Sequence, residues 1–481
     1  MSDDVGDLGG TRTRPSKGSP CCHESEEGNM SEAKTSDSMS VAKTAGNMES
    51  VSPGLLRVME RAKRNPQERQ LSLAYLIDVE ALRRSYQRTS GRAAVGVDGI
   101  DKKGYGQNLE ENLRDLHKRL KEMKYRHQPI LRVHIPKENG TRPIGISTVE
   151  DKIVQGALSE ILGAIYEQEF LECSYGFRPK RGPHDALRDL NQAVRNGEVN
   201  MVLEADIKSF FDTIVRKMLV EMLQERIADK SFMRLIGKCL HVGVLEGEEF
   251  SSPDEGTVQG SIISPILGNI YLHYALDKWF ETEVKPRLKG KAILIRYADD
   301  FIIGFEHEHD AKRVMEVLDK RMARYGLSLH PDKTQLIDFR RPPSNRRGGK
   351  GPGSFDFLGF TIYWKQNARG QGWHMSWKTR KARLGRFIKA VNDRCRSQRH
   401  RSVEDQHKSL VRQIRGNFNY YGINDNTRSL QMVLKEAERT WFKWLNRRSQ
   451  RSQLTWKRFK VLLQRYPLPS PQVYKNLWVT P

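Results

Sequence analysis

The chain has 481 residues, enough for about three domains, and a formal net charge of +23 that is unevenly distributed. Residues 1–50 hold nine acidic and five basic side chains, which leaves +27 on residues 51–481. A folded region with this excess repels itself unless it works beside a polyanion, so nucleic acid is the leading partner class and an anionic membrane surface the alternative. No apolar run approaches the roughly 20 residues that span a bilayer, and the five cysteines form no C-x-x-C pair. This excludes a membrane-spanning protein, a disulfide framework and paired-cysteine zinc sites.

The first part of the chain changes from a polar tail to helical periodicity. Residues 1–52 are rich in Ser, Gly, Thr, Asp and Glu, a composition typical of disorder. Residues 1–30 have no apolar stretch for a secretory signal and carry acidic residues unlike a transit peptide, so we expect a cytoplasmic protein. LSLAYLIDVEALRRSYQRT (71–89) predicts a helix, and residues 53–115 are expected to form a helical N-terminal extension.

From about residue 130 to 365 the pattern alternates between strands and helices, which predicts an α+β fold with a sheet backed by helices. The segment 151–170 has apolar residues at helical spacing. Residues 199–214 begin as a strand and then change period.

A further helix and strand are expected downstream. Asp310 is placed to cap a helix over 311–325, Gly326 supplies its end, and a strand resumes over 327–339. The HEHD segment at 307–310 has the composition of a metal cluster, but its place before a helix favours a solvated loop that ends in the cap.

Adjacent carboxylates stand out in RYADDFIIGF (296–305), where Asp299 and Asp300 lie between two apolar runs. The runs predict buried strands, and an ordinary hairpin turn is the alternative because Asp is common in turns. Asp206 follows the apolar run 201–203, so two strands are able to bring three carboxylates together. Hard divalent cations such as Mg²⁺ take a few carboxylates and complete their shell with substrate phosphates. Two such ions about 3.5–4 Å apart support phosphoryl transfer.

Groups suited to a nucleotide occur nearby. Lys137 and Arg142 lie five residues apart across a hairpin-like turn, from which both could reach a triphosphate. QGSIISPILGNIYL (259–272) places a small-residue turn before an apolar segment, where backbone can approach a nucleotide closely.

The last third is strongly basic. After a Pro/Gly-rich basic loop at 340–354, helical patterns are expected beyond 376. Residues 378–401 contain ten Lys and Arg against one acid, which favours a phosphate track over a merely solvated helix face. Residues 410–465 interleave basic and aromatic residues, a mixture that suits structured RNA; a small core with a charged surface is the alternative. The candidate RNA contacts are Arg380, Arg383, Arg386, Arg412, Arg415, Arg447 and Arg448.

Several of these segments occur in the order of a known family. RPIGISTVEDKIVQ, SYGFRPKRG, ADIKSFFD, QGSIISPILGNIYL, YADD, HPDKTQ and FLGF resemble the blocks of a bacterial reverse transcriptase. IRGNFNYYG, followed by WFKWLNRRSQ and TWKRFK, resembles the maturase segment of group II intron-encoded proteins. The chain therefore resembles a group II intron reverse transcriptase and maturase over roughly residues 55–465.

The resemblance implies a right-hand polymerase. It implies a fingers–palm domain over 116–363 with an antiparallel palm sheet, preceded by the N-terminal extension of the fingers. A basic helical thumb over 364–404 and an RNA-binding maturase region over 405–481 would follow.

The resemblance also implies residue roles. Asp206, Asp299 and Asp300 would be catalytic metal ligands, with the carbonyl of Ile207 helping to hold two Mg²⁺ ions, for which Mn²⁺ is a possible substitute. The nucleotide contacts would be Lys137, Arg142, Phe211 as the gate against a ribose 2′-hydroxyl, Gln259, and Lys333 near the leaving pyrophosphate. FDFLGF (355–360) would grip the primer end.

Each role has a plainer alternative. Phe211 could be core, Lys333 a solvated lysine at a strand end, and Gln259 a helix cap. Asp212 follows two Phe residues and is expected to be a turn or cap acid and not a metal ligand.

The sequence thus predicts an RNA-directed DNA polymerase that also binds intron RNA to assist splicing and mobility. Its partners would be group II intron RNA, an RNA template with a DNA primer, deoxynucleoside triphosphates and target DNA, with no membrane, in a cytoplasmic ribonucleoprotein. The alternatives are an RNA-binding splicing factor with a vestigial polymerase, and a reverse transcriptase recruited to repair or phage defence. The sequence shows no H-N-H nuclease with paired cysteines, so a primer end is expected from elsewhere.

Overall fold

The structure, a computed structural model, describes residues 52–137, 140–247, 249–251, 256–257, 259–343, 353–367, 372–449 and 453–478. The tail expected to be disordered lies outside these ranges except for Ser52, as does most of the basic loop expected at 340–354. Ser52 caps the first helix, because its side chain accepts a hydrogen bond from the backbone N–H of Leu55 at 3.2 Å.

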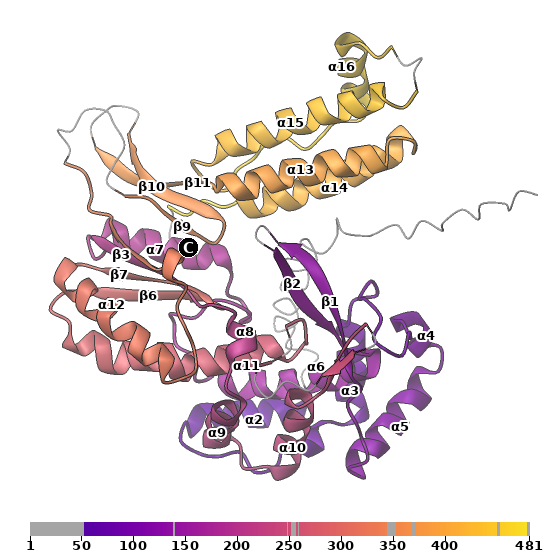
Figure 1. The fold of residues 1–481 in the computed structure, drawn as a ribbon, viewed down its shortest axis with the longest axis vertical. Coiled ribbons are helices and arrows are strands. Elements are labelled where there is room, and N and C mark those ends of the chain that lie inside the picture. The colour runs from indigo at the N-terminus through magenta and orange to yellow at the C-terminus, as the bar shows by residue number, and fades with distance from the viewer. Residues whose placement is uncertain are drawn as a thin grey trace, which may run out of the picture.

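Helices precede the first strand (Figure 1). They are α2 (Pro53–Arg64), the 3₁₀ turn η2 (Ala74–Leu76), α3 (Val79–Arg88), α4 (Lys102–Gly106) and α5 (Leu109–Lys121). The single helix expected over 71–89 is wrong, because the chain is interrupted before Asp78, which caps α3. The Asp229 carboxylate accepts hydrogen bonds from the backbone N–H groups of Leu73 and Ala74 at 2.6 and 2.8 Å, which removes these groups from a regular helix.

A small sheet follows, with strand order β2-β1-β4-β5. Its strands are β1 (Ile130–Lys137), β2 (Gly140–Ile146), β4 (Val244–Glu246) and β5 (Glu249–Ser251). β1 and β2 form the expected hairpin, with Lys137 paired to Gly140, and β4 runs parallel to β1.

The central sheet is antiparallel, with order β6-β7-β3-β8. Its strands are β3 (Met201–Asp206), β6 (Ala292–Tyr297), β7 (Asp300–Phe305) and β8 (Gln335–Asp338). Both faces are buried, as the alternation along β3 requires: Leu203 joins the larger hydrophobic core and Val202 joins a second core on the opposite face. This agrees with the expected α+β class.

Helices cover both faces of the central sheet (Figure 1). α12 (Glu308–Ala323) contributes Val314 and Leu318 to the larger core, and α7 (Pro183–Arg195) contributes Leu187 to the second. The other helices of this region are α6 (Val149–Tyr166), α8 (Phe210–Thr213), α9 (Arg216–Arg226), α10 (Lys230–Leu240) and α11 (Ser264–Leu272).

α12 begins earlier than expected, so the prediction that Asp310 caps it is wrong. Asp310 lies in the first turn and is buried. Its carboxylate accepts hydrogen bonds from the backbone N–H groups of Lys289 and Gly290, both at 2.9 Å, and so fixes the loop before β6. HEHD is thus the start of a helix, and Gly326, with φ of +66°, follows its end as expected.

A third sheet, β11-β10-β9, packs on the second core. It comprises β9 (Phe355–Phe357), β10 (Phe360–Gln366) and β11 (Trp373–Thr379). Residues 364–379 are expected to open a helical thumb, but most of them form strands. The reason is the alternation of inward-facing residues along β10 and β11, whose Trp364, Trp373 and Trp377 fill the second core.

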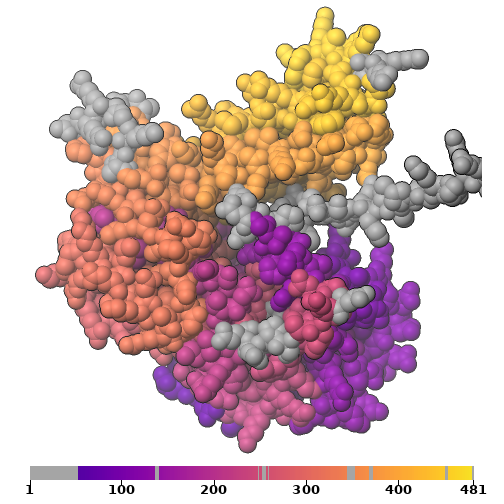
Figure 2. Space-filling model, in the orientation of Figure 1, coloured from indigo at the N-terminus to yellow at the C-terminus, as the bar shows by residue number. Residues whose placement is uncertain are grey.

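The C-terminal helices α13 (Lys381–Ser397), α14 (Val403–Tyr421), α15 (Thr427–Asn446) and α16 (Trp456–Arg465) share one core of their own. Val391, Ile414 and Trp441 are buried in it. Figure 2 shows this bundle as a separate yellow and orange lobe above the indigo and magenta surface of the N-terminal half. Among the described residues, no helix is both long enough and apolar enough to span a bilayer.

α11 continues into two π-helical turns, η3 (His273–Asp277) and η4 (Phe280–Val284). His273 is buried against the ring of Phe170, with centroids 5.7 Å apart. Burial lowers the pKa of His273 to about 4, although the charge of Asp277 acts in the opposite direction.

A pH-dependent loss of stability is expected from His273. Below pH 6.5 the unfolded chain binds a proton at His273 that the folded chain does not accept. The contribution of His273 to the free energy of unfolding is therefore fully present above pH 6.5 and falls as the pH drops toward 4. The contribution is about 3 kcal/mol at its limit. Thermal unfolding of wild type and His273→Gln between pH 7.5 and 5 measures it: the midpoint of wild type should fall more steeply. Parallel pH dependences would contradict the assignment.

Candidate active site

Three carboxylates meet at one end of the central sheet. β3 ends at Asp206 and β7 begins at Asp300, and the two residues are paired across the antiparallel strands. Asp299 lies in the two-residue turn that joins β6 to β7. Short apolar strands thus deliver all three acids to one edge.

The electrostatics reflect this convergence. Desolvation by the surrounding protein and then the charges of Asp299 and Asp206 raise the pKa of Asp300 to about 7. Asp300 still keeps substantial contact with solvent. Its desolvation is therefore partial, and the repulsion among like charges is the better supported cause. A cation placed here would relieve that repulsion.

Lys333 already places a cation against this cluster. It lies in the 3₁₀ turn η6 (Pro331–Lys333), and its ammonium forms an ion pair with the Asp206 carboxylate. The turn is fixed to β3 because the backbone N–H of His330 donates to the carbonyl of Asp206 at 2.8 Å.

The donor chemistry fits a hard divalent cation, since the cluster offers carboxylate oxygens and a lysine occupies a cationic position beside it. Within the described residues, no three His, Cys, Asp or Glu side chains are close enough together to form a complete ligand group. The chain's carboxylates would therefore supply part of a coordination shell, as they do where substrate phosphates and water complete it.

A buried arginine holds the turn that carries Asp299. The guanidinium of Arg296 is fully buried and forms a bidentate ion pair with Asp277, with Nε donating to Oδ1 at 2.7 Å. It also donates to Asn269 Oδ1 at 3.0 Å, to Ser174 Oγ at 2.8 Å and to the carbonyl of Ala298 at 3.0 Å. One side chain thus joins the strand, the π-helix and the turn.

The turn itself is strained and tightly packed. Ala298 has φ of +56°, a left-handed conformation that costs an L-residue about 1–2 kcal/mol. Gly176 lies against it so closely that an added Cβ would be 2.4 Å from the backbone nitrogen of Ala298. The amide of Asn269 donates to the carbonyl of Gly176 at 2.7 Å, which ties SYGF into the same network.

A second group of predicted site residues lies on the small sheet and beside α8. Arg142 on β2 donates from Nε to Gln259 Oε1 at 2.9 Å, and the backbone N–H of Gly145 donates to the Gln259 carbonyl at 2.7 Å. Gln259 therefore contacts a strand and does not cap a helix. Burial raises the pKa of Asp212, whereas the charges of Arg132 and Arg142 lower it, so α8 lies near Arg142.

Phe211 and Ile207 occupy defined places beside this group. Phe211, on α8, is half-buried, packs against the larger core, and its carbonyl accepts from the backbone N–H of Thr257 at 2.7 Å. Ile207 is buried and bridges to Leu329. The backbone of Lys137 lies in β1, but its side chain falls outside what the structure describes.

The C-terminal bundle reaches the carboxylates through α13 and α14. Arg383, exposed on α13, lowers the pKa of Asp300, in opposition to the raising effects above. The hydroxyl of Tyr420 donates to the carbonyl of Leu358 at 2.8 Å, and a Cβ on Gly359 would be 2.8 Å from the Tyr421 hydroxyl. FDFLGF is thus packed against the end of α14.

The other candidate RNA contacts are distributed over the bundle. Arg386, Arg412 and Arg415 are exposed, whereas Arg380 pairs with Asp356 at 2.9 Å. Arg447 lies over the ring of Trp444, 5.6 Å from its centroid, together with Lys443 and Arg396. Arg448 donates to the carbonyl of Arg401 at 2.8 Å. Arg380 and Arg448 therefore also have structural contacts.

Sequence reasoning did not find the residues that support the cluster: Ser174, Gly176, Asn269, Asp277 and Arg296. One signal was available in the sequence. Arg296 follows the apolar run before YADD, and a charged residue in a buried strand requires a buried partner. The partner's identity was not evident from the sequence.

Comparison with known proteins agrees with this geometry. Residues 135–362 match the family model described as "Reverse transcriptase (RNA-dependent DNA polymerase)". The chain is 35% identical over 280 residues to Protein YkfC of Escherichia coli (strain K12), covering 52% of this chain and 73% of YkfC. It is 32% identical over 304 residues to the group II intron-encoded protein LtrA of Lactococcus lactis subsp. cremoris, covering 60% of this chain and 50% of LtrA. It is 28% identical over 290 residues to the putative COX1/OXI3 intron 1 protein of Saccharomyces cerevisiae, covering 50% of this chain and 33% of that protein.

The chain therefore belongs to the reverse transcriptase family, and among its relatives is the group II intron-encoded protein LtrA. It spans about half the length of LtrA and a third of the yeast protein. Reverse transcriptases use divalent metal ions, which agrees with the oxygen donors at the sheet edge.

Gly176→Ala should lower the rate of nucleotide addition by roughly 100-fold, because the added methyl group would displace the turn that carries Asp299. Misplacement of a catalytic group by about 1 Å has an effect of this order. Gly163→Ala on α6 is the matched control, since no atom lies within 4 Å of its added Cβ. The control should keep the wild-type rate and gain about 0.5–1 kcal/mol of stability. Single-nucleotide addition and thermal unfolding measure both effects, and equal rates for Gly176→Ala and wild type would contradict the packing argument.

Proposed function

We propose that this chain is the RNA-directed DNA polymerase of a group II intron, which synthesises cDNA by metal-assisted nucleotidyl transfer. The observation that carries the proposal is the pairing of Asp206 with Asp300 at the ends of two strands, beside Asp299 in the adjoining turn, together with the charge repulsion that Asp206 and Asp299 exert on Asp300. Its membership of the reverse transcriptase family supports the reaction type.

In the proposed site, the carboxylates of Asp206, Asp299 and Asp300 and the carbonyl of Ile207 hold two Mg²⁺ ions. The bound ions supply positive charge that activates the primer 3′-hydroxyl and stabilises the leaving oxygen. The buried Arg296 fixes the turn, so that Asp299 does not need to be reoriented during the reaction.

The incoming deoxynucleotide is held from the small sheet. Arg142 and Lys137 contact the triphosphate, and Gln259 orients Arg142 through the hydrogen bond at 2.9 Å. The half-buried ring of Phe211 excludes a ribose 2′-hydroxyl, because its position on α8 is fixed by packing against Phe210 and the core. Lys333 pairs with Asp206 and is the candidate proton donor to the leaving pyrophosphate.

In this proposal residues 53–115 form an N-terminal extension and residues 116–363 a fingers–palm domain, on whose second core the strands of 364–379 pack. The thumb then begins with α13 and runs to residue 404, and residues 405–481 form a maturase region. Arg380, Arg383 and Arg386 on or beside α13 face the duplex, with Arg383 nearest the carboxylates. Arg412, Arg415, Arg447 and Arg448 bind RNA. The cations around Trp444 offer phosphate contacts beside an aromatic ring, which suits structured RNA.

The proposed partners are group II intron RNA, an RNA template with a DNA primer, deoxynucleotides and target DNA, in a cytoplasmic ribonucleoprotein. The relative that supports intron RNA as a partner is LtrA, which is described as group II intron-encoded.

Primer extension on an RNA template with Mg²⁺ and deoxynucleotides tests the proposal. Asp299→Ala should lower extension by roughly 10³-fold or more, because metal-supplied charge stabilisation is worth several kcal/mol. Asp319→Ala, an exposed acid on α12, is the matched control and should extend at the wild-type rate. Chelation of divalent ions should abolish extension, and Phe211→Val should raise the use of ribonucleotides relative to deoxynucleotides by roughly 10–100-fold.

No extension by wild type, with tight binding to structured RNA, would overturn the polymerase assignment and leave an RNA-binding splicing factor. Equal extension by wild type and Asp299→Ala would remove the carboxylate cluster from the mechanism.

A further inference from the structure

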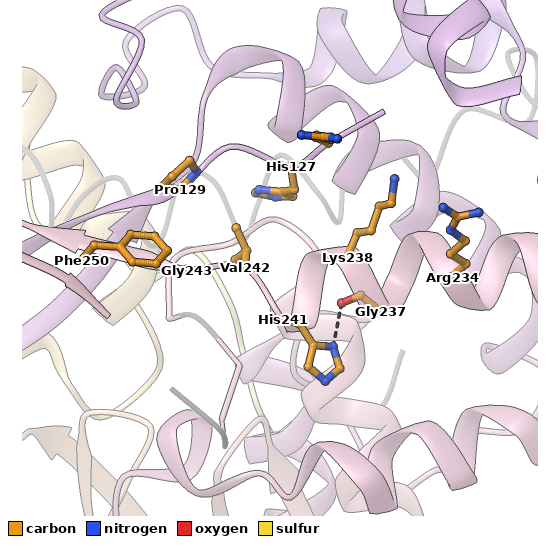
Figure 3. A pocket seen from close by; sticks show the side chains of 10 residues that line it. His127, Pro129, Arg234, Gly237, Lys238, His241, Val242, Gly243 and Phe250 are labelled. Atoms are coloured by element: carbon orange, nitrogen blue, oxygen red, sulfur yellow. Dashed lines mark hydrogen bonds between the residues drawn. The ribbon is translucent and has the colours of Figure 1, made fainter. Parts of the chain in front are cut away.

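A basic cavity of about 600 Å³ lies beside the start of β1, and none of the three carboxylates lines it (Figure 3). It is formed by the segment before β1, the C-terminal half of α10, the link to β4, and β5. Its lining residues are Arg126, His127, Pro129, Arg234, Gly237, Lys238, His241, Val242, Gly243 and Phe250.

Among the residues that the structure describes, the lining carries positive charge and no acidic side chain. Figure 3 shows Arg234 and Lys238 extending from α10 in the same direction. Burial and then the charges of Arg234 and Arg126 lower the pKa of Lys238, so the three cations are close enough to repel one another. The Lys238 ammonium donates to the carbonyl of Tyr125, which holds it in place. An anion is the ligand that would relieve this repulsion.

An aromatic ring lies at the other end of the cavity (Figure 3). Phe250 is 63% exposed although it is a large apolar residue. Its ring covers Gly243 so closely that an added Cβ there would be 2.2 Å from Phe250 Cζ. One edge of the ring therefore abuts the backbone at Gly243, and much of the rest is open to solvent.

Two described acids of the β4–β5 hairpin lie on the face away from Phe250. Phe250 pairs with Leu245, and Glu246 pairs with Glu249, so the two acidic residues lie on the other face of the β4–β5 hairpin. There Glu246 contacts His134 at 3.0 Å and Arg132 at 3.6 Å.

We propose that this cavity binds single-stranded RNA, with an unpaired base stacked on Phe250 and adjacent phosphates held by Arg126, Arg234 and Lys238. Cations beside an accessible aromatic ring are the combination that recognises unpaired nucleotides. A duplex would bury its bases from Phe250. The inference rests on the proposed function, because it assigns the cavity to the template strand or to an unpaired loop of the intron RNA.

The cavity is connected to the nucleotide site. The imidazole of His127 lies 2.8 Å from the amide nitrogen of Gln155. Gln155 Oε1 in turn accepts hydrogen bonds from Ser261 Oγ at 2.9 Å and from the backbone N–H of Ile262 at 3.1 Å. These residues follow Gln259 in the turn beside Arg142. β5 is also three strands from β2, about 14 Å at the usual strand spacing, which a few nucleotides can cross.

The test measures binding of the full chain to fluorescein-labelled RNA–DNA primer–templates with a blunt end or a ten-nucleotide 5′ uridine overhang, and to free ten-nucleotide uridine RNA. In wild type the overhang should tighten binding. Phe250→Ala should remove about 5–100-fold of that gain and leave blunt-end affinity unchanged, since stacking one base contributes about 1–3 kcal/mol. Phe250→Trp should restore it, and an abasic overhang should not distinguish the variants.

Charge is tested with Arg234→Gln and Lys238→Gln, each of which should weaken overhang binding and reduce its salt dependence by about 0.7 in logarithmic slope per phosphate contact. Tyr75→Ala is the matched control, because Tyr75 is 62% exposed and lies outside the cavity. It should bind every probe as wild type does.

If Phe250→Ala loses binding to the free RNA but binds the overhang primer–template as wild type does, the cavity binds single-stranded RNA and its ligand is an unpaired RNA loop. Equal binding of all probes by Phe250→Ala and wild type would overturn the proposal. Addition of one nucleotide on a template with a one-nucleotide overhang should be the same in Phe250→Ala and wild type. Failure of wild type to extend would overturn the polymerase assignment separately from the RNA-binding result.

Discussion

The buried ion pair between Arg296 and Asp277 is the interaction on which the active-site geometry depends. Both side chains are completely removed from solvent, and leaving one without its partner costs about 3–5 kcal/mol in comparable sites. The remaining guanidinium donors bind Asn269, Ser174 and the carbonyl of Ala298, so segments that are far apart in sequence meet at one group. The strained conformation of Ala298 persists because this network and the contact with Gly176 determine it.

The arrangement around this centre is a body with two arms (Figure 1). The small sheet carries Arg142, hydrogen-bonded to Gln259, and the C-terminal bundle brings Arg383 close enough to the carboxylates to lower the pKa of Asp300. The bundle is joined to the second core through Tyr420, whose ring stacks on Phe360 at 5.8 Å and whose carbonyl lies 2.7 Å from His184 Nε2. Movement of the bundle would therefore be transmitted to FDFLGF and to α7.

Much of this could be predicted from sequence where local pattern decides the structure. The apolar runs around Asp206 and YADD specify strands, and the Asn139–Gly140 pair specifies the hairpin of β1 and β2. The sequence failed where distant partners override local pattern. Asp229 interrupts the helix expected at 71–89, and Asp310 serves a loop instead of its own helix end. Arg296 could be recognised as a buried charge, but its partner 19 residues earlier could not, because the π-helical turn that presents Asp277 leaves no local signature.

Single-nucleotide addition by Asp277→Asn at 20 °C tests most directly whether the Arg296–Asp277 pair positions the catalytic turn. Asparagine keeps the shape and a hydrogen-bond acceptor but removes the charge that Arg296 requires. We expect the rate to fall by roughly 10–100-fold while primer–template affinity and the far-UV circular dichroism spectrum stay at wild-type values. A folded Asp277→Asn protein that adds nucleotides at the wild-type rate would show that the ion pair does not position the turn.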